Sequence, residues 1–367
     1  MVRSLAHGLL AGGFLLRCAL ATGCSADDRA PSTPDGMDAL DAAAEPVTLR
    51  NPVRRGAADP FLWYVDGAYY LTYTAVNRIE VVRARSISEL GAATPTVIWR
   101  DSTPSRCCNM WAPELHRIGA RWYVYYTADD GQIGNHRMFV LESAGDDPLG
   151  PYTFKAKLAT QDFFAIDGTV VELDGAPYFV WSGVPPTQPK SQNLYLARMS
   201  NPWTLTGPTA LLSAPYLSWE TKGVGGTIER VNEAPAALYR DGKAFIVFSA
   251  SQCATPDYAL GTLSYANAGG GPLATSSWTK SDDPQFAKTA ANQVYGPGHN
   301  SFFTSPDGTE VWNAYHAVDK PQGSCGGDRS LRVQRIGFRA DGSPELGVPV
   351  ATTEVLTAPS GDPGPQP

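Results

Sequence analysis

Hydrophobic and polar positions alternate along most of the chain, and a period of two residues predicts β-strands. Five segments repeat the same order of elements: a short strand, a turn that contains glycine, an aromatic-rich strand, a gap and a third alternating strand. The aromatic-rich strands read YYLTYTA, WYVYYTA, PYFVWSG, AFIVFSAS and VWNAYHAV. Asp-Gly pairs stand in the turns of all repeats except the second, and such pairs are typical of β-hairpins. The pattern therefore predicts five consecutive antiparallel units.

The length of the repeat separates two kinds of all-β fold. The repeats begin at Asp59, Trp111, Asp167, Glu233 and His299. A small antiparallel sheet that recurs at intervals of this order indicates a β-propeller. A sandwich of two sheets would not produce a fivefold repeat. We therefore predict an all-β fold, a five-bladed β-propeller over residues 50–357.

Composition agrees with a turn-rich β fold and narrows the choice of ligand. The 367 residues include 36 Gly and 30 Pro, a density of turn residues that argues against a mainly helical protein. The net charge is −7 and no block of Lys and Arg occurs, which argues against a nucleic-acid partner or an anionic membrane surface. A neutral or weakly polar ligand fits better.

Residues 1–24 resemble a secretory signal rather than part of the fold. Arg3 precedes an apolar run over residues 8–16, which is too short to span a membrane. The sequence Ala-Thr-Gly before Cys24 resembles the lipobox that directs lipidation of a bacterial lipoprotein. A lipid anchor at Cys24 and cleavage without a lipid are both open. We expect a secreted or lipid-anchored protein at the cell surface, with no transmembrane span.

Two further segments are predicted to lie outside the folded unit. Residues 25–49 are rich in Ala, Asp and Pro, a composition typical of a flexible linker. We expect residues 358–367 to form a flexible tail.

Four cysteines lie in the predicted propeller, and in an exported protein they suggest disulfides. They are Cys107, Cys108, Cys253 and Cys325. Up to two disulfides are possible, in any of three pairings. The adjacent Cys107 and Cys108 either bond to different partners or form a ring with each other. We expect a structural role, because no Cys or His spacing typical of a zinc site occurs.

The residues that begin the five repeats form a candidate active site. In a propeller the first strand of each blade lines the central channel, so equivalent residues of these strands form one ring at its mouth. Aligned on the turn glycines, the ring consists of Asp59, Trp111, Asp167, Glu233 and His299. Carboxylates that share a desolvated pocket repel one another and cost stability unless function requires them. We therefore expect chemistry at this ring.

The residues around the ring also resemble a known family. The motifs of glycoside hydrolase family 43 are similar, in chain order, to ADPF at 58–61, WAPE at 111–114, IDGT at 166–169, EAP at 233–235 and GHNS at 298–301. The flanking sequences WAPELH, NEAPA, GPGHNS and LRVQ most resemble the α-L-arabinofuranosidase branch of the family. The resemblance covers residues 50–356.

The resemblance implies an inverting mechanism with three carboxyl groups. Asp59 would be the general base that activates water, and Glu233 the general acid that protonates the leaving oxygen. Asp167 would orient Glu233 and raise its pKa. Acid and base on blades four and one would face each other across the channel, which leaves room for the water that inversion requires.

Other positions are implied to bind the sugar or a metal ion. Phe61 and Trp111 would form apolar walls against the terminal sugar, and Trp181 would extend this platform. Arg332 stands where the family has a substrate-binding arginine. His299 would help to hold a calcium ion that is coordinated mainly by water, or would contact the substrate directly. For each aromatic residue core packing is the alternative, and for Arg332 it is a surface salt bridge.

The expected function is hydrolysis of terminal α-L-arabinofuranosyl groups from arabinose-containing polysaccharides of plant cell walls or their oligosaccharides. No organic cofactor is implied. A β-xylosidase and an endo-arabinanase of the same family are the nearest alternatives. A catalytically inactive, carbohydrate-binding propeller is the alternative from another class.

Overall fold

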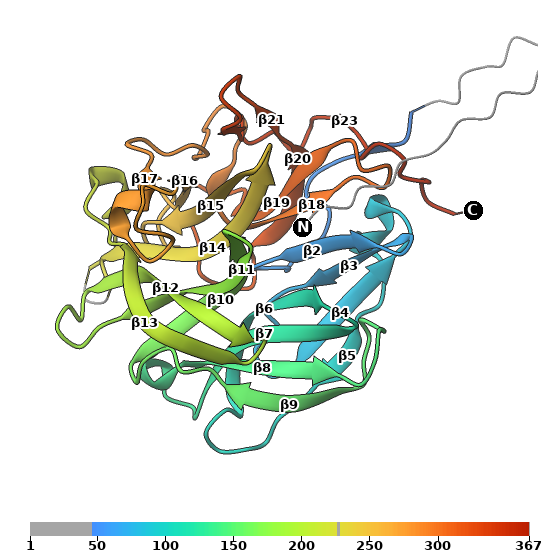
Figure 1. Cartoon of the computed structure of the whole chain (residues 1–367). Coiled ribbons are helices and arrows are strands. Elements are labelled where there is room, and N and C mark those ends of the chain that lie inside the picture. Colours follow the sequence, from blue (N-terminus) through green and yellow to red (C-terminus); the bar gives the residue numbers. More distant parts are fainter. Residues whose placement is uncertain (1–45, 226–227, 367) are drawn as a thin grey trace, which may run out of the picture. The chain divides into compact units, whose positions relative to one another are not determined.

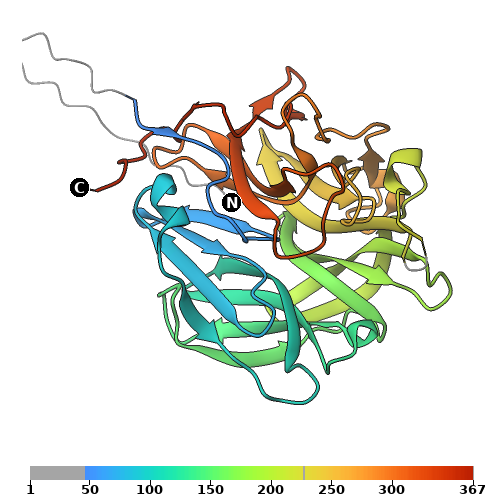
Figure 2. The same cartoon turned by 180° about the vertical axis from the view of Figure 1, so that it is seen from behind.

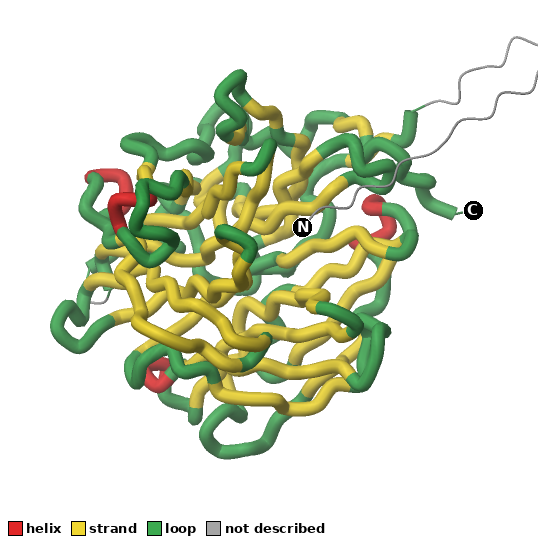
Figure 3. The backbone as a smooth tube through the Cα atoms, viewed as in Figure 1, coloured by secondary structure: helices red, strands yellow, loops and turns green. Residues whose placement is uncertain are grey.

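The computed structural model describes residues 46–225 and 228–366 of the protein. The predicted signal over residues 1–24 and most of the predicted linker lie outside this part. The regular structure of the described residues is almost entirely β-strand, with four short 3-10 helices, so the all-β prediction is confirmed (Figure 3). None of the described helices is long and apolar enough to cross a membrane.

The main strands form five consecutive sets in which neighbouring strands pair antiparallel (Figure 1). A short parallel pairing of residues 191–192 with residues 230–231 joins the third set to the fourth. The first set consists of β2 (Phe61–Val65), β3 (Ala68–Thr72), β4 (Ile79–Ala84) and β5 (Thr96–Trp99). The second set consists of β6 (Cys108–Ile118), β7 (Arg121–Asp129), β8 (Arg137–Ser143) and β9 (Tyr152–Lys157). The third set consists of β10 (Phe164–Leu173), β11 (Ala176–Val184), β12 (Ser191–Asn201) and β13 (Thr204–Ser213). The fourth set consists of β14 (Arg230–Arg240), β15 (Lys243–Ala250), β16 (Ala259–Tyr265) and β17 (Trp278–Lys280), and the fifth of β18 (Tyr295–Thr304), β19 (Val311–Val318) and β20 (Ser330–Arg335).

Smaller elements connect and cover these sets. The 3-10 helices are η1 (Ile87–Gly91), η2 (Ile133–Asn135), η3 (Ser218–Glu220) and η4 (Thr275–Ser277). Two short antiparallel pairs are β1 (Thr48–Leu49) with β23 (Leu356–Thr357) and β21 (Gly337–Phe338) with β22 (Pro344–Glu345). The pairing of β1 with β23 places the beginning and the end of the folded unit side by side (Figure 2).

The Asp-Gly pairs make the tight turns that the sequence predicts. In three of these turns both residues have a positive φ: Asp66-Gly67, Asp174-Gly175 and Asp241-Gly242. A two-residue hairpin loop with positive φ at both positions matches the right-handed twist of the flanking strands. Each turn joins the first and second strands of its set, and this fixes the register of the aromatic-rich strand.

The hydrophobic core lies between neighbouring sets. Four clusters join the first set to the second, the second to the third, the third to the fourth and the fourth to the fifth. A fifth cluster packs Leu62 and Leu71 of the first set against Trp312 and Val333 of the fifth. The first strands contact one another in the same cyclic order, from β2 through β6, β10, β14 and β18 back to β2. No hydrogen-bonded sheet among the described strands closes on itself, so side-chain packing closes this cycle.

The chain ends differ from the sequence expectation. Strand β1 begins at Thr48, inside the segment predicted as a linker. The carboxylate of Asp362 accepts hydrogen bonds from Ser86 Oγ at 2.6 Å and from the Ile87 amide at 2.9 Å. Residues 358–366 are therefore anchored to the first set, whereas we predicted a flexible tail. Ser360 also donates from its amide to Glu310 and from its hydroxyl to Asp307, so polar contacts that no hydrophobic pattern marks hold this segment.

Both disulfides that the cysteine count allows are present. Cys107 and Cys108 form a ring with each other at the start of β6. Cys253 and Cys325 join the loop after β15 to the loop between β19 and β20. The second disulfide therefore links the fourth and fifth sets across a separation of 72 residues.

Candidate active site

The first strand of each set is irregular at the level of the predicted ring. Register shifts interrupt the pairing of β6, β10, β14 and β18 with the next strand. In every set a residue other than glycine has a positive φ here: Asp59, Ala112, Asp167, Ala234 and His299, with φ between 43° and 56°. β-Bulges re-aim side chains, and unusual backbone conformations gather at functional sites. The positive φ therefore recurs in all five sets, and the register shift in four of them, at one level of the fold.

Four of the five predicted ring residues meet in one buried cluster. Only 7% of Asp59, 7% of Asp167 and 8% of His299 is exposed, and Glu233 is partly buried. Nδ1 of His299 lies 3.2 Å from Oδ1 of Asp59. The charges of His299, Glu233 and Asp59 all act on Asp167. We call Asp59, Asp167, Glu233 and His299 the charged ring.

Asp59 is surrounded by donors. Arg329 donates from Nη1 to Oδ1 at 2.6 Å, and Thr74 Oγ1 donates to Oδ2 at 2.7 Å. Burial alone would raise the pKa of Asp59, but the charges of Arg329 and His299 hold this pKa well below its ordinary value of 3.8. Asp59 is therefore ionised at neutral pH.

His316 is neutral and contacts the backbone of Asp59. The Asp59 amide donates to Nδ1 of His316 at 3.1 Å, so this nitrogen is an acceptor and the proton of the ring lies on Nε2. Burial and the charge of Arg329 lower the pKa of His316 to about 3. His316 also stacks on Tyr258, with ring centroids 5.6 Å apart.

Glu233 is held by two donors on different strands and loops. Tyr258 donates from its hydroxyl to Oε1 at 2.9 Å, and Gln192 donates from Nε2 to Oε2 at 2.6 Å. Gln192 Nε2 also donates to Ser182 Oγ at 2.9 Å. The carboxyl group therefore has a fixed orientation within the charged ring.

Asp167 and Glu233 have raised pKa values, in contrast to Asp59. Burial raises the pKa of both groups, and for Asp167 the charges of Glu233 and Asp59 bring it to about 8. Burial alone would lower the pKa of His299, but the charges of Asp59 and Asp167 raise it to about 9. At neutral pH the charged ring thus combines one carboxylate, one cationic imidazole and a carboxyl pair that holds at least one proton. The sequence predicted a raised pKa for Glu233, and the structure raises the pKa of Asp167 as well.

The predicted aromatic residues divide into two groups. Trp111 is partly exposed and stacks on His136, with ring centroids 4.0 Å apart. Phe61 is also partly exposed and lies 5.0 Å from the His116 ring. Trp181 is 0% exposed and belongs to the core cluster between the second and third sets. As placed, Trp181 cannot contact a sugar, which corrects its predicted role as part of the platform.

The predicted substrate-binding arginine is also buried. Arg332 is 0% exposed, and its Nη2 forms an ion pair with Asp319. The arginine that reaches the charged ring is Arg329, three residues earlier in the chain. Arg332 is therefore buried within β20 and paired with Asp319, whereas Arg329 lies in the loop before β20 and pairs with Asp59.

Sequence reasoning missed five residues whose side chains form hydrogen bonds with Asp59 or Glu233. They are Thr74, Arg329, His316, Tyr258 and Gln192. None of them begins a repeat, and they come from outer strands and loops. Only the arginine pair in RSLRVQ gave a signal, and spacing alone does not tell which of the two arginines turns inward.

The donor set does not provide a calcium site from protein atoms. Among the described residues, no group of three His, Cys, Asp or Glu side chains could hold a metal ion. His299 offers an imidazole nitrogen, whereas calcium prefers six to eight oxygen ligands. The Nδ1 atom of His299 is already directed at Asp59.

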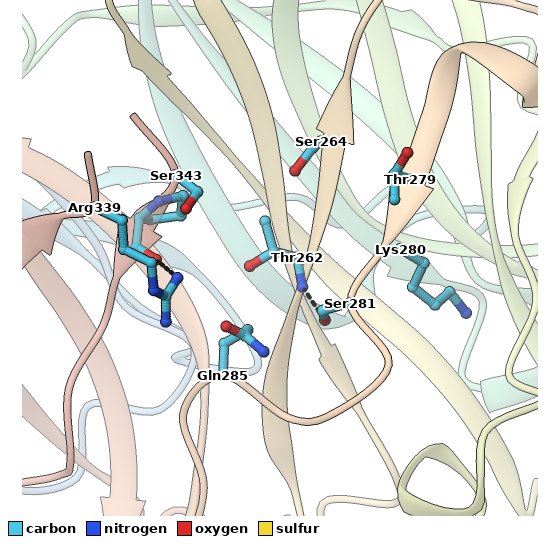
Figure 4. A pocket seen from close by; sticks show the side chains of 9 residues that line it. Thr262, Ser264, Thr279, Lys280, Ser281, Gln285, Arg339 and Ser343 are labelled. Carbon is cyan, nitrogen blue, oxygen red and sulfur yellow. Dashed lines mark hydrogen bonds between the residues drawn. The ribbon is translucent and has the colours of Figure 1, made fainter. Parts of the chain in front are cut away.

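A separate hollow of about 180 Å³ lies on the outer strands of the fourth set (Figure 4). It is lined by Thr262, Ser264, Thr279, Lys280, Ser281, Gln285, Arg339, Ser343 and Pro344. None of these residues belongs to the charged ring. The candidate active site is therefore the charged ring and not this hollow.

Comparison with known proteins assigns the family. The family model described as "Glycosyl hydrolases family 43" matches residues 49–344, so the chain belongs to this family. An extracellular exo-α-(1→5)-L-arabinofuranosidase of Streptomyces avermitilis is 38% identical over 84% of this chain, and the match spans 65% of that relative. A protein of the same name from Streptomyces chartreusis is 39% identical, with 75% of this chain and 84% of the relative covered. The crystal structure of an α-L-arabinofuranosidase from Lactobacillus brevis aligns with a TM-score of 0.76 and 34% identity, and covers 83% of this chain and 98% of that chain.

Proposed function

We propose that this member of family 43 is an inverting glycoside hydrolase that releases terminal α-L-arabinofuranosyl groups from arabinan, arabinoxylan or their oligosaccharides. The observation that carries the proposal is the contrast within the charged ring, where Asp59 is ionised and the Asp167–Glu233 pair keeps a proton. An enzyme that needs a base and an acid at the same pH requires such a contrast. The names of the relatives support arabinofuranose as the sugar.

In this mechanism Asp59 takes a proton from a water molecule, and the oxygen of that water attacks the anomeric carbon. Glu233 gives its proton to the glycosidic oxygen as the bond between this oxygen and the anomeric carbon breaks. Attack opposite to the leaving group inverts the configuration and requires carboxyl groups roughly 6.5–9.5 Å apart. Each proton transfer contributes about 10²–10⁴-fold to the rate.

The remaining ring residues prepare these two groups. Asp167 keeps the acid protonated and oriented, because a second buried carboxyl group beside Glu233 disfavours a second negative charge. His299 balances the charge of Asp59 and lies within reach of the sugar. Trp111 and Phe61 supply apolar surface to the terminal sugar.

The architecture and the chain ends belong to the same proposal. The cyclic packing of the five sets of strands supports a five-bladed β-propeller. We propose that residues 1–24 direct export, that residues 25–49 include a linker and that Cys24 is a candidate lipid anchor. Mass spectrometry of the mature N-terminus tests these points. An intact Met1 would contradict export, and an unmodified N-terminus beyond Cys24 would contradict only the lipid.

Calcium held through water beside His299 stays a separate proposal, and no step above depends on it. Prolonged chelation followed by addition of calcium tests it through the melting temperature and the rate. Indifference of both quantities to chelation would remove the ion from the proposal.

A panel of nitrophenyl glycosides tests the reaction and separates the alternatives. We expect turnover of the α-L-arabinofuranoside, and proton NMR of the first product should show β-L-arabinofuranose. A preference for the β-D-xyloside would indicate a β-xylosidase, and release of oligosaccharides from linear arabinan would indicate an endo-arabinanase. Binding of arabinan without turnover of any substrate would indicate a non-catalytic propeller.

A further inference from the structure

We propose that the buried ion pair of Lys280 and Glu220 positions Glu233 for proton transfer to the leaving group. Among the described residues, the two form no hydrogen bond or ion pair with the charged ring, and Asn232 connects them to Glu233. They are positioning residues rather than catalytic ones. This inference rests on the role of Glu233 proposed above.

The ion pair is tightly enclosed. Nζ of Lys280 lies 2.7 Å from Oε1 of Glu220, and the two side chains are 7% and 0% exposed. Nζ also donates to the Ala214 carbonyl at 2.8 Å and lies over the Tyr216 ring, 4.4 Å from its centroid. In Figure 4 the Lys280 side chain points away from the other groups that line the hollow. The ammonium group is thus directed into the protein and not toward that hollow.

Asn232 connects the ion pair to the acid. Its Nδ2 donates to Oε1 of Glu220 at 2.9 Å, and its Oδ1 accepts from Nζ of Lys280 at 3.2 Å and from Ser213 Oγ at 2.7 Å. Asn232 is 0% exposed and directly precedes Glu233 in β14. Because successive residues of a strand point to opposite faces, an anchored Asn232 fixes the backbone from which Glu233 projects.

A second path leads from the same residue to the carboxyl group itself. The carbonyl of Asn232 accepts a hydrogen bond from Ser182 Oγ at 2.8 Å. Ser182 Oγ in turn accepts from Nε2 of Gln192, which also donates to Oε2 of Glu233 at 2.6 Å. A displaced Asn232 would therefore disturb both the backbone and one direct hydrogen bond of the acid.

The energetics argue that this ion pair serves position more than stability. Burial lowers the pKa of Lys280, which shows that desolvation opposes its charge, and the negative charge of Glu220 offsets part of this effect. Replacing both members of a buried ion pair by apolar residues is often neutral or stabilising, whereas removing one member leaves an unpaired buried charge. A double variant therefore separates positioning from stability.

The main experiment compares the wild type with the double variant Glu220→Leu/Lys280→Met on two arabinofuranosides. We expect about 10- to 100-fold lower kcat on an arabino-oligosaccharide, whose leaving group needs the proton, and less than about threefold on the nitrophenyl substrate. KM should change little, because no sugar contact is removed.

A matched control is Glu142→Leu/Lys155→Met, since Lys155 pairs with Glu142 at 2.8 Å and lies over the Trp203 ring, 3.9 Å from its centroid. The control should leave kcat on both substrates unchanged.

Equal losses on both substrates would overturn the proposal, because they would show a general structural defect. An unchanged kcat in the folded double variant would overturn it as well. If the double variant does not fold, Glu220→Gln replaces it and should show the same dependence on the leaving group. This variant keeps the size of the side chain and removes its charge.

Hydrogen–deuterium exchange gives a readout that does not depend on turnover. We expect faster exchange over residues 230–236 in the double variant and no change in the control. A wild type that cleaves no arabinofuranoside would refute the proposed function, and exchange alone would then decide whether the ion pair fixes this segment. Unchanged exchange over residues 230–236 would overturn the inference whatever the activity.

Discussion

Arg329 and Asp59 form a two-pronged ion pair where the last set of strands meets the first. Nη1 of Arg329 lies 2.6 Å from Oδ1 of Asp59, and Nη2 lies 3.4 Å from Oδ2. Nη2 also donates to the carbonyl of Cys325 at 3.0 Å, and Cys325 is bonded to Cys253. Asp59, the proposed base near the beginning of the folded unit, is therefore held by a disulfide-bonded loop near the end of the chain.

Replacing Arg329 by methionine should impair the proposed base. Without the guanidinium the pKa of Asp59 rises, so the acidic limb of the pH–rate profile should move upward by about 1–3 pH units. Measurement of kcat/KM from pH 3 to 9 checks this. Arg335→Met is the control, because Arg335 pairs with Glu310 on the surface and its side chain is 64% exposed. An unmoved acidic limb in Arg329→Met would show that the ion pair does not set the charge of Asp59.

Removing the disulfide between Cys253 and Cys325 should lower both stability and rate. Closing a loop of this length contributes about 4 kcal/mol in the chain-entropy model. The freed loop also carries the partner of Asp59, so kcat should fall more than stability alone explains. Chemical denaturation and kinetics of Cys253→Ala/Cys325→Ala test this, with Cys107→Ala/Cys108→Ala as the control. Normal kcat in the folded first variant would contradict the coupling of this loop to Asp59.

The acid and the base should respond differently to substitution. Asp59→Ala should abolish activity on every arabinofuranoside, because no other group activates the water. Glu233→Ala should reduce the rate on natural oligosaccharides by about 10²–10⁴-fold and spare nitrophenyl substrates more, because their leaving group needs less protonation. Rates on both substrates measure this. A near-normal Asp59→Ala variant, or retention of configuration by the wild type, would refute the assigned mechanism.

Asp167 should make the stability of the wild type fall as the pH rises. The pKa of Asp167 is about 8 in the folded protein and ordinarily 3.8. Protonation of Asp167 therefore stabilises the folded state fully below pH 3.8, and this stabilisation is lost as the pH rises through about 8. Asp167→Asn should therefore gain about 2–4 kcal/mol relative to the wild type between pH 4 and pH 8. Urea denaturation at several pH values checks this difference. The exposed Asp146→Asn serves as the control, and a flat difference for Asp167→Asn would contradict the raised pKa.

The two tryptophans should separate binding from folding. Trp111→Ala should raise KM for the arabinofuranoside, since the partly exposed ring supplies apolar surface to the sugar. Trp181→Ala should destabilise the protein by about 3–5 kcal/mol, because it leaves a cavity in the core between the second and third sets. Kinetics and denaturation of both variants test this. A normal KM in Trp111→Ala would remove this residue from the sugar site.

The charged ring was predictable because it depends on repetition. The fivefold order of strands and turns put Asp59, Asp167, Glu233 and His299 at equivalent positions, and equivalent positions in such a repeat meet in space. The Asp-Gly turns could be predicted equally well, since their positive φ values are a local property of two residues. These inferences needed no contact between distant segments.

The residues that contact the charged ring were not predictable, because their contacts join segments that are far apart in the chain. Arg329 reaches Asp59 across 270 positions of sequence, and Arg332, with the same chemistry three residues later, turns into the core. Trp111 in β6 and Trp181 in β11 are both strand tryptophans, yet only Trp111 is partly exposed.

The sequence by itself thus determined the all-β class, the repeat and the identity of the ring residues, because hydrophobic alternation and turn chemistry are local. Only the tertiary structure decided which arginine holds the base, which cysteines pair and which side chains fix the acid. Those choices depend on the direction of each side chain and on packing between sets of strands, and both follow from contacts among residues that are far apart in the chain.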